Sequence, residues 1–317
     1  MRSRRLLSLG ALLASLTIVA TGCGGDDNKL DSTGDKKSDG GSGKSVVIGS
    51  AGFTEIQLMA EMYKLLLEDA GYKASIKVVQ NREVYEPALE KGTVDVVPDY
   101  AATMTEFLNI KANGESAETV ATNDKDETVE ALNKLGEPLG IKALDAAEAV
   151  DQNAFVATKE LAEANGEALS DWDGKSVKLA ATEECPDRPF CQLGLEKTYG
   201  LKVTEVLPLG FGTAQVKEAV KSDKAQLGLT GTTDATLEDL GLVVIEDDKK
   251  LQLADNLVPV VGKDFADDSK LADALNSLAG ELSTEDLAGL NKKVDAERMK
   301  AADVAKEFLE SKDLLGG

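Results

Sequence analysis

Histidine is absent from this chain of 317 residues. Its absence excludes Ser-His-Asp and Cys-His nucleophilic catalysis, zinc sites built on imidazole, and the commonest general base of enzymes. Basic residues are also scarce, with 35 Lys and Arg against 57 Asp and Glu and a formal net charge of −22. A protein that binds the phosphate backbone of a nucleic acid needs a basic face, so we expect no nucleic-acid partner.

Aromatic residues are few, at 4% of the chain, whereas hydrophobic residues make up 42% and charged residues 29%. The last two values are those of a globular protein, and the length suffices for one large or two modest domains with real cores. Since a small set of aromatic rings must serve both packing and any ligand, each of them is worth locating individually.

The N-terminus has the features of a bacterial export signal. Three arginines precede an apolar run over residues 6–20, and small residues follow it up to Cys23. The run is shorter than the roughly 20 residues that span a membrane, and this pattern is typical of a secretory signal. A Cys directly after small residues resembles the lipobox, although Ala20 stands where Leu is commoner. We expect a signal peptide over residues 1–22 and a lipid anchor at Cys23 on the extracytoplasmic face of the cell membrane; an ordinary signal peptide with an incidental Cys is the alternative.

Residues 23–44 are a low-complexity segment of Gly, Ser, Asp and Lys. Such a composition cannot bury apolar area, so we expect a flexible tether between the lipid and the folded part.

The rest of the chain alternates short β-branched runs with amphipathic segments, which predicts an α/β fold with parallel sheets. Expected strands cover residues 45–49, 75–79, 94–97, 177–181, 203–207, 226–229, 242–246 and 258–261. Expected helices cover residues 54–70, 85–91, 101–109, 193–199 and 216–221, and the chain is mostly helical from residue 269. Thr54, three residues before Gln57, has the spacing of a capping box that opens the first helix.

Two such series predict two lobes, with a cleft between them for a small ligand. We expect the first lobe to comprise residues 45–148 and 232–317, and the second lobe residues 149–231.

Cys185 and Cys191 remain once Cys23 carries a lipid, and an even pair in an exported protein is most simply a disulfide. The bridge would make the loop between them rigid. A metal or redox role would need CxxC spacing or further ligands, and the sequence has neither, so we expect no metal site.

Three segments carry a family resemblance: IGSAGFTEIQLMAEMYKLLLEDAG, ALEKGTVDVVPDYAATMTEFL, and RPFCQLGLEKTYGL followed by LTGTTDATLEDLGLVVIEDDKK. Their order and spacing, over residues 45–265, resemble the periplasmic binding proteins of osmoprotectant ABC transporters of the glycine betaine/carnitine/choline type. In the second segment the matching positions are Ala88, Gly92, Asp95, Pro98, Tyr100 and Thr103.

The resemblance implies a two-lobed, periplasmic-binding-protein-like fold of type II that closes around its ligand. Such ligands carry a quaternary ammonium, which has no N–H and is recognised by aromatic faces, and often a carboxylate, which suits Arg. By their positions, Tyr100 matches a cage tyrosine, Thr103 a hydroxyl beside the carboxylate, and Arg188 the carboxylate-binding arginine, while Asn153 and Phe155 fall where the family often has a polar residue and a tyrosine.

Each of these roles has a structural alternative. Tyr100 could pack at a strand end, Thr103 could cap the following helix, Arg188 could form a surface ion pair, and Phe155 could belong to the core.

Two positions depart from the family pattern. Many members have a Lys where this chain has Ala51, and an aromatic residue where it has Gly231. The aromatic side chain that is missing at residue 231 could be replaced by Phe211, Phe190 or Phe53. The exact solute is therefore left open among glycine betaine, choline and carnitine types.

The resemblance also implies partners, namely a membrane permease and a cytoplasmic ATPase; no cofactor is expected. The main alternative is the same fold with another small solute: an amino acid, a polyamine or an aromatic compound. A secreted enzyme is disfavoured. The chain has no His, and its candidate catalytic carboxylates are sequence neighbours such as Glu183 and Glu184, which cannot lie on opposite sides of a substrate bond.

Overall fold

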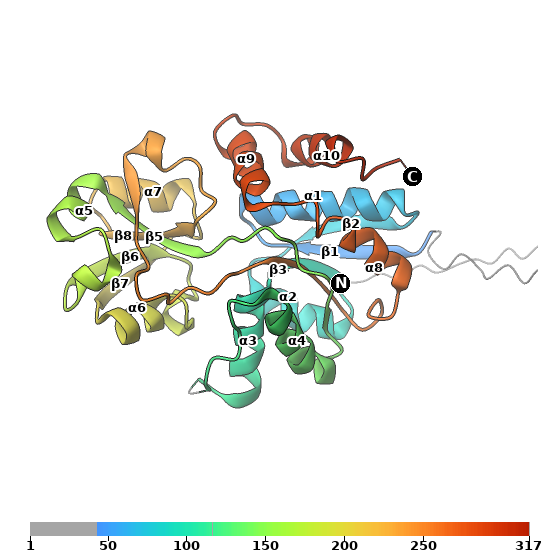
Figure 1. The fold of residues 1–317 in the computed structure, drawn as a ribbon, viewed down its shortest axis with the longest axis horizontal. Coiled ribbons are helices and arrows are strands. Elements are labelled where there is room, and N and C mark those ends of the chain that lie inside the picture. Colours follow the sequence, from blue (N-terminus) through green and yellow to red (C-terminus); the bar gives the residue numbers. More distant parts are fainter. Residues whose placement is uncertain (1–42, 116, 317) are drawn as a thin grey trace, which may run out of the picture. The chain divides into compact units, whose positions relative to one another are not determined.

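The computed structural model describes residues 43–115 and 117–316 (Figure 1). The expected signal peptide and the lipid anchor at Cys23 lie outside this part of the chain. The tether expected to reach Lys44 ends sooner, because the Gly43 N–H donates to the Gly71 carbonyl at 2.8 Å and the Lys44 ammonium lies 3.7 Å from the centre of the Phe265 ring. Within the described ranges, none of the helices combines the length and apolarity that crossing a membrane requires.

The first lobe is built on a five-stranded sheet of order β2-β1-β3-β10-β4. Its strands are β1 Ser45–Ser50, β2 Lys73–Val78, β3 Val96–Tyr100, β4 Lys142–Ala143 and β10 Leu257–Val261. β1 is parallel to β2 and β3, whereas β10 is antiparallel to β3 and β4. The expectation of parallel sheets was therefore wrong for β10, which enters from the other lobe instead of following a helix of its own lobe.

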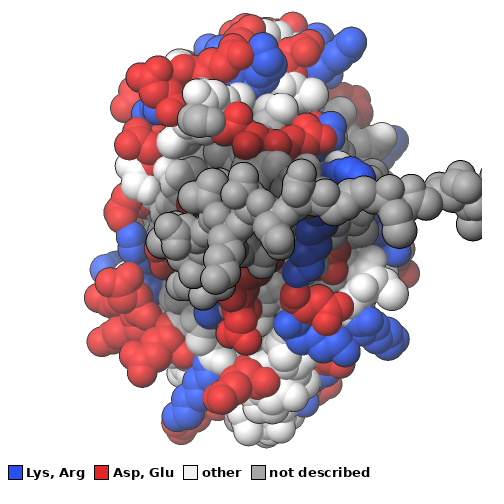
Figure 2. Space-filling view, turned by 90° about the vertical axis from the view of Figure 1, so that its right-hand side faces the viewer, with Lys and Arg blue, Asp and Glu red and all other residues white. Residues whose placement is uncertain are grey.

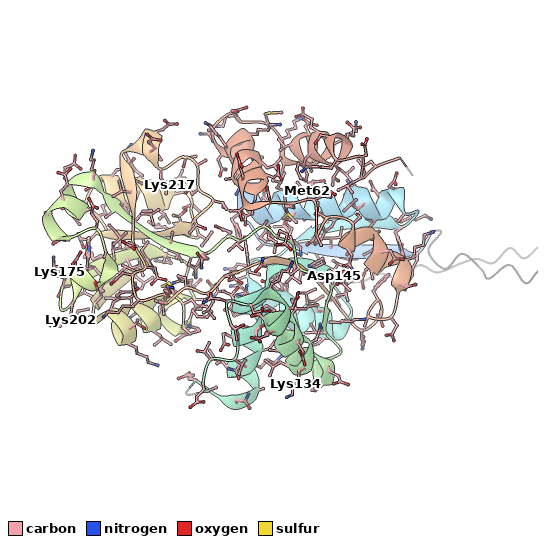
Figure 3. The ribbon with its side chains drawn as sticks, in the orientation of Figure 1. Met62, Lys134, Asp145, Lys175, Lys202 and Lys217 are labelled. Carbon is pink, nitrogen blue, oxygen red and sulfur yellow. A yellow bond between two sulfur atoms is a disulfide. The ribbon has the colours of Figure 1, made fainter. Side chains whose placement is uncertain are left out.

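Helices cover both faces of this sheet (Figure 1). α1 Thr54–Asp69, α8 Ser269–Asn276, α9 Thr284–Asp295 and α10 Ala301–Ser311 contribute to one core cluster, and α2 Arg82–Lys91, α3 Ala101–Asn113 and α4 Lys125–Gly136 surround the other. Met62 of α1, labelled in Figure 3, is fully buried in the first cluster. The C-terminal helices therefore pack in the first lobe, to which the sequence analysis assigned them.

The first helix begins where the sequence predicts, but not by the predicted capping box. The Thr54 hydroxyl donates to Asp295 of α9 at 2.6 Å, and the Gln57 amide donates to the Gly52 carbonyl at 3.0 Å. The side chain of the N-cap residue, Phe53, makes no capping hydrogen bond. The Thr54 hydroxyl is therefore used in a contact with a residue 241 positions away and not as a helix cap.

The second lobe contains a sheet of order β7-β6-β8-β5-β9. Its strands are β5 Asn153–Thr158, β6 Ser176–Ala181, β7 Lys202–Pro208, β8 Leu227–Gly231 and β9 Leu242–Ile245, and its helices are α5 Lys159–Asn165, α6 Gln192–Tyr199 and α7 Ala214–Lys221. Short 3-10 turns lie at Glu137–Leu139, Leu169–Trp172, Cys185–Asp187 and Glu238–Leu240. The core of this lobe contains the buried rings of Phe155, Trp172 and Tyr199.

The expected return to the first lobe at residue 232 was too early. β9 pairs antiparallel with β5, with Phe155 opposite Ile245, so the chain stays in the second lobe beyond that strand. A short apolar strand packs equally well in either sheet, and its sequence pattern carries no information about which one it joins.

The two chain segments that cross between the sheets lie side by side. Val150 and Asn256 form an antiparallel bridge, and the Asp151 N–H donates to the Asp255 carbonyl at 3.1 Å. These paired crossings join the two lobes and place two acidic residues at their junction.

The acidic excess is visible on one face of the protein. On the face drawn in Figure 2, acidic side chains are distributed widely, with Lys and Arg side chains between them. Such a surface favours solubility.

Candidate ligand-binding site

A cavity of about 690 Å³ lies between the lobes. Its first-lobe wall comes from the loop after β1, the start of α2 and the junction of β3 with α3, and its second-lobe wall from the loops after β6 and β7. Both walls are therefore formed at the carboxyl ends of parallel strands, which is where open α/β sheets bind their ligands.

Aromatic side chains are concentrated in this cavity. The chain has one Trp, five Tyr and seven Phe. Six of these rings line the cavity: Phe53, Tyr85, Tyr100, Phe107, Phe190 and Phe211. The Phe53 ring is stacked on that of Tyr100, with centroids 6.4 Å apart, and lies 5.1 Å from that of Phe211 in the other lobe. We call Phe53, Tyr100 and Phe211 the aromatic cluster.

Tyr100 lies where the sequence placed it, at the end of β3 and in the cavity wall. Its hydroxyl donates to Glu55 of α1, a buried carboxylate that also accepts from Thr233 at 2.8 Å and from Asn291 at 2.6 Å. Burial and the negative Glu55 raise the pKa of Tyr100 well above its usual value, so the phenol stays neutral and its ring is held in one orientation.

Thr103 lines the cavity in the first turn of α3 and does not cap that helix. Its hydroxyl accepts from the Arg82 guanidinium at 2.8 Å. The helix start is capped instead by the Asp255 carboxylate, which accepts from the N–H groups of Ala102 at 2.7 Å and Thr103 at 3.2 Å.

Arg82 and Asp99 form a buried ion pair that our sequence analysis missed. The guanidinium makes two hydrogen bonds to the carboxylate, one of them 3.1 Å long from Nε, and the Tyr85 hydroxyl donates to the same carboxylate. An acid in the strand-end sequence VPDY, next to the expected cage tyrosine, was the one signal that could have pointed to this pair.

Gly231 is explained by Asp151. A Cβ at residue 231 would lie 2.3 Å from Asp151 Oδ2, so only glycine leaves room for this carboxylate. The other oxygen of Asp151 accepts from the Thr232 hydroxyl and the Thr233 N–H, both at 3.0 Å. Where many family members place an aromatic ring, this chain therefore has a buried acid.

Arg188 lines the cavity but already has a carboxylate partner. Its guanidinium donates to both oxygens of Glu83, at 3.0 and 2.9 Å, and so joins the second lobe to α2 of the first. Asn81 donates to Glu184 across the same gap. The pair is partly exposed, which agrees with the surface ion pair that we kept as the alternative for Arg188.

Asn153 and Phe155 differ although both lie on β5. Asn153 lines the cavity, and its amide donates to the Phe190 carbonyl at 3.3 Å. Phe155 is 1% exposed in the core of the second lobe and is not part of the cavity wall, which agrees with the core position that we kept as its alternative. It lies two residues further from the cavity edge, between the sheet and its helices.

The predicted disulfide between Cys185 and Cys191 is confirmed, and it closes the loop that carries Arg188 and Phe190. Ala51 lines the cavity and brings no charge to it. In residues 43–115 and 117–316, no group of three or more Cys, Asp or Glu side chains has the arrangement of a metal site.

Two sheets joined by paired crossings, with an aromatic cavity between them, define a solute-binding protein. The chain belongs to the family described as the substrate binding domain of ABC-type glycine betaine transport systems, whose profile matches residues 44–311. The predicted resemblance is confirmed, and with it the expectation that the chain is not an enzyme, since its relatives are substrate-binding proteins of transporters.

Two curated relatives are each 25% identical to the chain. One is the glycine-betaine-binding protein of Pseudomonas aeruginosa, over 84% of this chain and 88% of the relative. The other is the carnitine transport binding protein OpuCC of Listeria monocytogenes, over 88% of this chain and 90% of the relative. A solved glycine betaine/carnitine/choline ABC transporter structure is 22% identical, with a TM-score of 0.62 over 86% of this chain and 99% of that one. This likeness confirms the periplasmic-binding-protein-like fold of type II.

Proposed function

We propose that this chain is the lipid-anchored, extracytoplasmic solute-binding component of an ABC importer. It captures a quaternary-ammonium osmoprotectant of the glycine betaine, choline or carnitine type between its lobes and delivers it to a membrane permease that a cytoplasmic ATPase drives. Family membership supports the transport role, and the sequence before residue 43 supports the anchor at Cys23.

The observation that carries this proposal is the aromatic cluster. A quaternary ammonium cannot donate a hydrogen bond, and each aromatic face within about 6 Å stabilises it by roughly 0.5–2 kcal/mol. Phe53 and Tyr100 come from the first lobe and Phe211 from the second. A cation held between them therefore links ligand binding to closure of the lobes.

We assign Tyr100, Phe53 and Phe211 to the ammonium group, and Asn153 and Thr103 to the polar end of the solute. A carboxylate on the solute could reach Arg188 only by displacing Glu83. Which of these solutes binds therefore depends on whether the cavity can accommodate a carboxylate on the ligand.

The test is calorimetry on the purified protein with glycine betaine, choline, carnitine and proline betaine. Micromolar or tighter binding of at least one of them is expected. The control is the neutral tert-butyl analogue of choline, which has the same shape without the charge and should bind much more weakly. The proposal would be contradicted if none of the four quaternary amines bound, or if the neutral analogue bound as tightly as choline.

A further inference from the structure

The charged side chains that line the cavity are mostly acidic. Eight are carboxylates: Glu83, Asp99, Glu115, Asp151, Glu183, Glu184, Asp187 and Asp255. Three are cations: Arg82, Lys111 and Arg188. The excess of negative groups favours a positively charged ligand over a neutral or zwitterionic one.

Each of the three cations is already paired with a carboxylate of the protein. Arg82 is bound by Asp99, and Arg188 by Glu83. Lys111 lies 2.8 Å from both oxygens of Glu86. Because Ala51 adds no charge, a carboxylate on the ligand would meet no unpaired cation among the described lining residues.

Asp151 is in the opposite situation. Its side chain is 95% buried, since only 5% of the residue is exposed, and it forms no ion pair with Lys or Arg anywhere in residues 43–115 and 117–316. It lines the cavity near Tyr100, at the place that glycine at residue 231 leaves open. An ionised carboxylate buried without a cation is costly, and a ligand cation in the cavity would favour the ionised form of Asp151.

We infer that the cavity selects an organic cation that carries no carboxylate, and that Asp151 is the counter-ion and specificity-determining residue for this ligand. The inference rests on the proposed function, since it narrows the solute class for the same site. A trimethylammonium group would contact the aromatic cluster on its faces, with the Asp151 charge completing its surroundings.

The groups around Asp151 link binding to a proton. Glu55 of α1 faces it, Tyr100 lies beside Glu55, and Asp255 comes from the paired crossing segment. Burial and the charge of Glu55 raise the pKa of Asp151 well above its usual value. Burial also raises the pKa of Glu55, although its hydrogen bonds from Tyr100, Thr233 and Asn291 oppose this shift, so the empty site favours one proton on the pair formed by Asp151 and Glu55. A bound cation reverses this preference, and the proton should leave as the ligand enters.

The test compares choline with glycine betaine, which share a trimethylammonium head and differ in a hydroxyl against a carboxylate. The wild-type protein should bind choline about tenfold tighter or more. Asp151→Asn keeps the shape of the side chain and its hydrogen-bond acceptor but removes the charge. It should therefore weaken choline binding and abolish the preference for choline over glycine betaine. Asp239→Asn is an exposed substitution outside the cavity with the same change in net charge, and it should retain the preference for choline.

Calorimetry of choline binding in two buffers of different ionisation enthalpy measures the number of protons released on binding. A purely structural role of Asp151 would leave this number unchanged in the variant. The wild type should release protons on binding, and Asp151→Asn should release fewer.

Glycine betaine binding at least as tight as choline overturns the inference and leaves the proposed function intact. A choline preference that survives in Asp151→Asn overturns the role of this residue. Absence of binding by both ligands in the folded wild type contradicts the proposed function, and the inference with it. The ligand comparison on the wild type needs no variant, so it stands even if Asp151→Asn fails to fold.

Discussion

The two walls of the cavity are built in different ways. On the first-lobe wall the side chains are fixed by buried polar contacts, with Arg82 bound to Asp99 and Tyr100 to Glu55. On the second-lobe wall, Phe211 lies on a loop after a strand and Arg188 on a loop closed by a disulfide, with its side chain 30% exposed. From this difference we expect the first lobe to present a preformed surface to the ligand and the second lobe to complete the site on closing.

The second lobe does contain a buried ion pair, but away from the cavity. Lys217 of α7, labelled in Figure 3, lies 2.6 Å from Asp234 after β8, and neither residue lines the cavity. Its rigid polar contacts therefore support the sheet of the second lobe, whereas those of the first lobe support the binding surface itself.

The largest expected effect comes from the buried pair of the first lobe. Arg82→Met leaves Asp99 buried without its cation and should lower the free energy of unfolding by about 3–5 kcal/mol. Arg188→Met breaks a partly exposed pair and should lower it by less than about 1 kcal/mol. Urea unfolding at neutral pH measures both, and similar losses for the two variants would contradict the contrast between the walls.

The disulfide should come second. Replacing Cys185 and Cys191 together by Ser frees a short loop of the second-lobe wall and should lower the free energy of unfolding by about 2 kcal/mol, in the chain-entropy model. Ligand affinity should fall as well, because Phe190 loses its fixed position. Reduction of the wild type should reproduce both effects and leave the double variant unchanged; a sensitive double variant would show that the reductant acts elsewhere.

The pH dependence of stability should come third. Burial raises the pKa of Asp255 to about 7, so the folded state holds a proton that the unfolded state has already lost in mildly acidic solution. This group therefore favours the folded state at acidic pH, and its contribution declines as pH rises from about 4 to about 7, by up to about 1.4 kcal/mol per pH unit.

Asp255→Asn keeps an acceptor for the start of α3 and removes this titration. The difference in unfolding free energy between Asp255→Asn and the wild type should grow in favour of the variant over that pH window. Carboxylates with lowered pKa values, such as Asp234 and Asp268, change the unfolding free energy with pH in the opposite direction. They do so equally in both proteins, so their contribution cancels in the comparison. A constant difference across the window would exclude a raised pKa at Asp255.

The smallest effect separates core from cavity within the second lobe. Phe155→Leu should lower the free energy of unfolding by about 1 kcal/mol and leave choline binding unchanged, because this ring packs only in the core. Thermal unfolding and calorimetry on the same samples measure both properties. A loss of affinity without a loss of stability would restore the binding role that the family pattern suggested for Phe155.

The strand and helix order of the fold was accessible from sequence because local periodicity determines it, and most expected elements are present with shifted ends. β9 was assigned to the wrong lobe, since sheet partners depend on contacts distant in the chain. α4, β5 and α5 were not predicted. Tyr100, Thr103, Asn153 and Phe211, which the sequence analysis named as candidates, all line the cavity, and Tyr100 and Asn153 do so from strand ends.

The remainder of the site could not be predicted from the sequence for a physical reason. The pairing of Arg188 with Glu83 joins residues 105 positions apart, and the exchange of an aromatic wall for Asp151 depends on a contact with Gly231. The first depends on how the two lobes meet and the second on the pairing of β5 with β8, and neither leaves a periodic pattern in the sequence.

The central claim, that a quaternary ammonium is held between rings from both lobes, is tested most directly by choline titrations of the wild type, Phe53→Leu and Phe211→Leu. Each substitution removes one aromatic face, in the first and the second lobe respectively, and should weaken binding about tenfold with little change in unfolding. Phe265→Leu, outside the cavity, is the matched control and should bind as the wild type does. Unchanged affinity in either cavity variant would contradict the account, because one lobe alone would then hold the ligand.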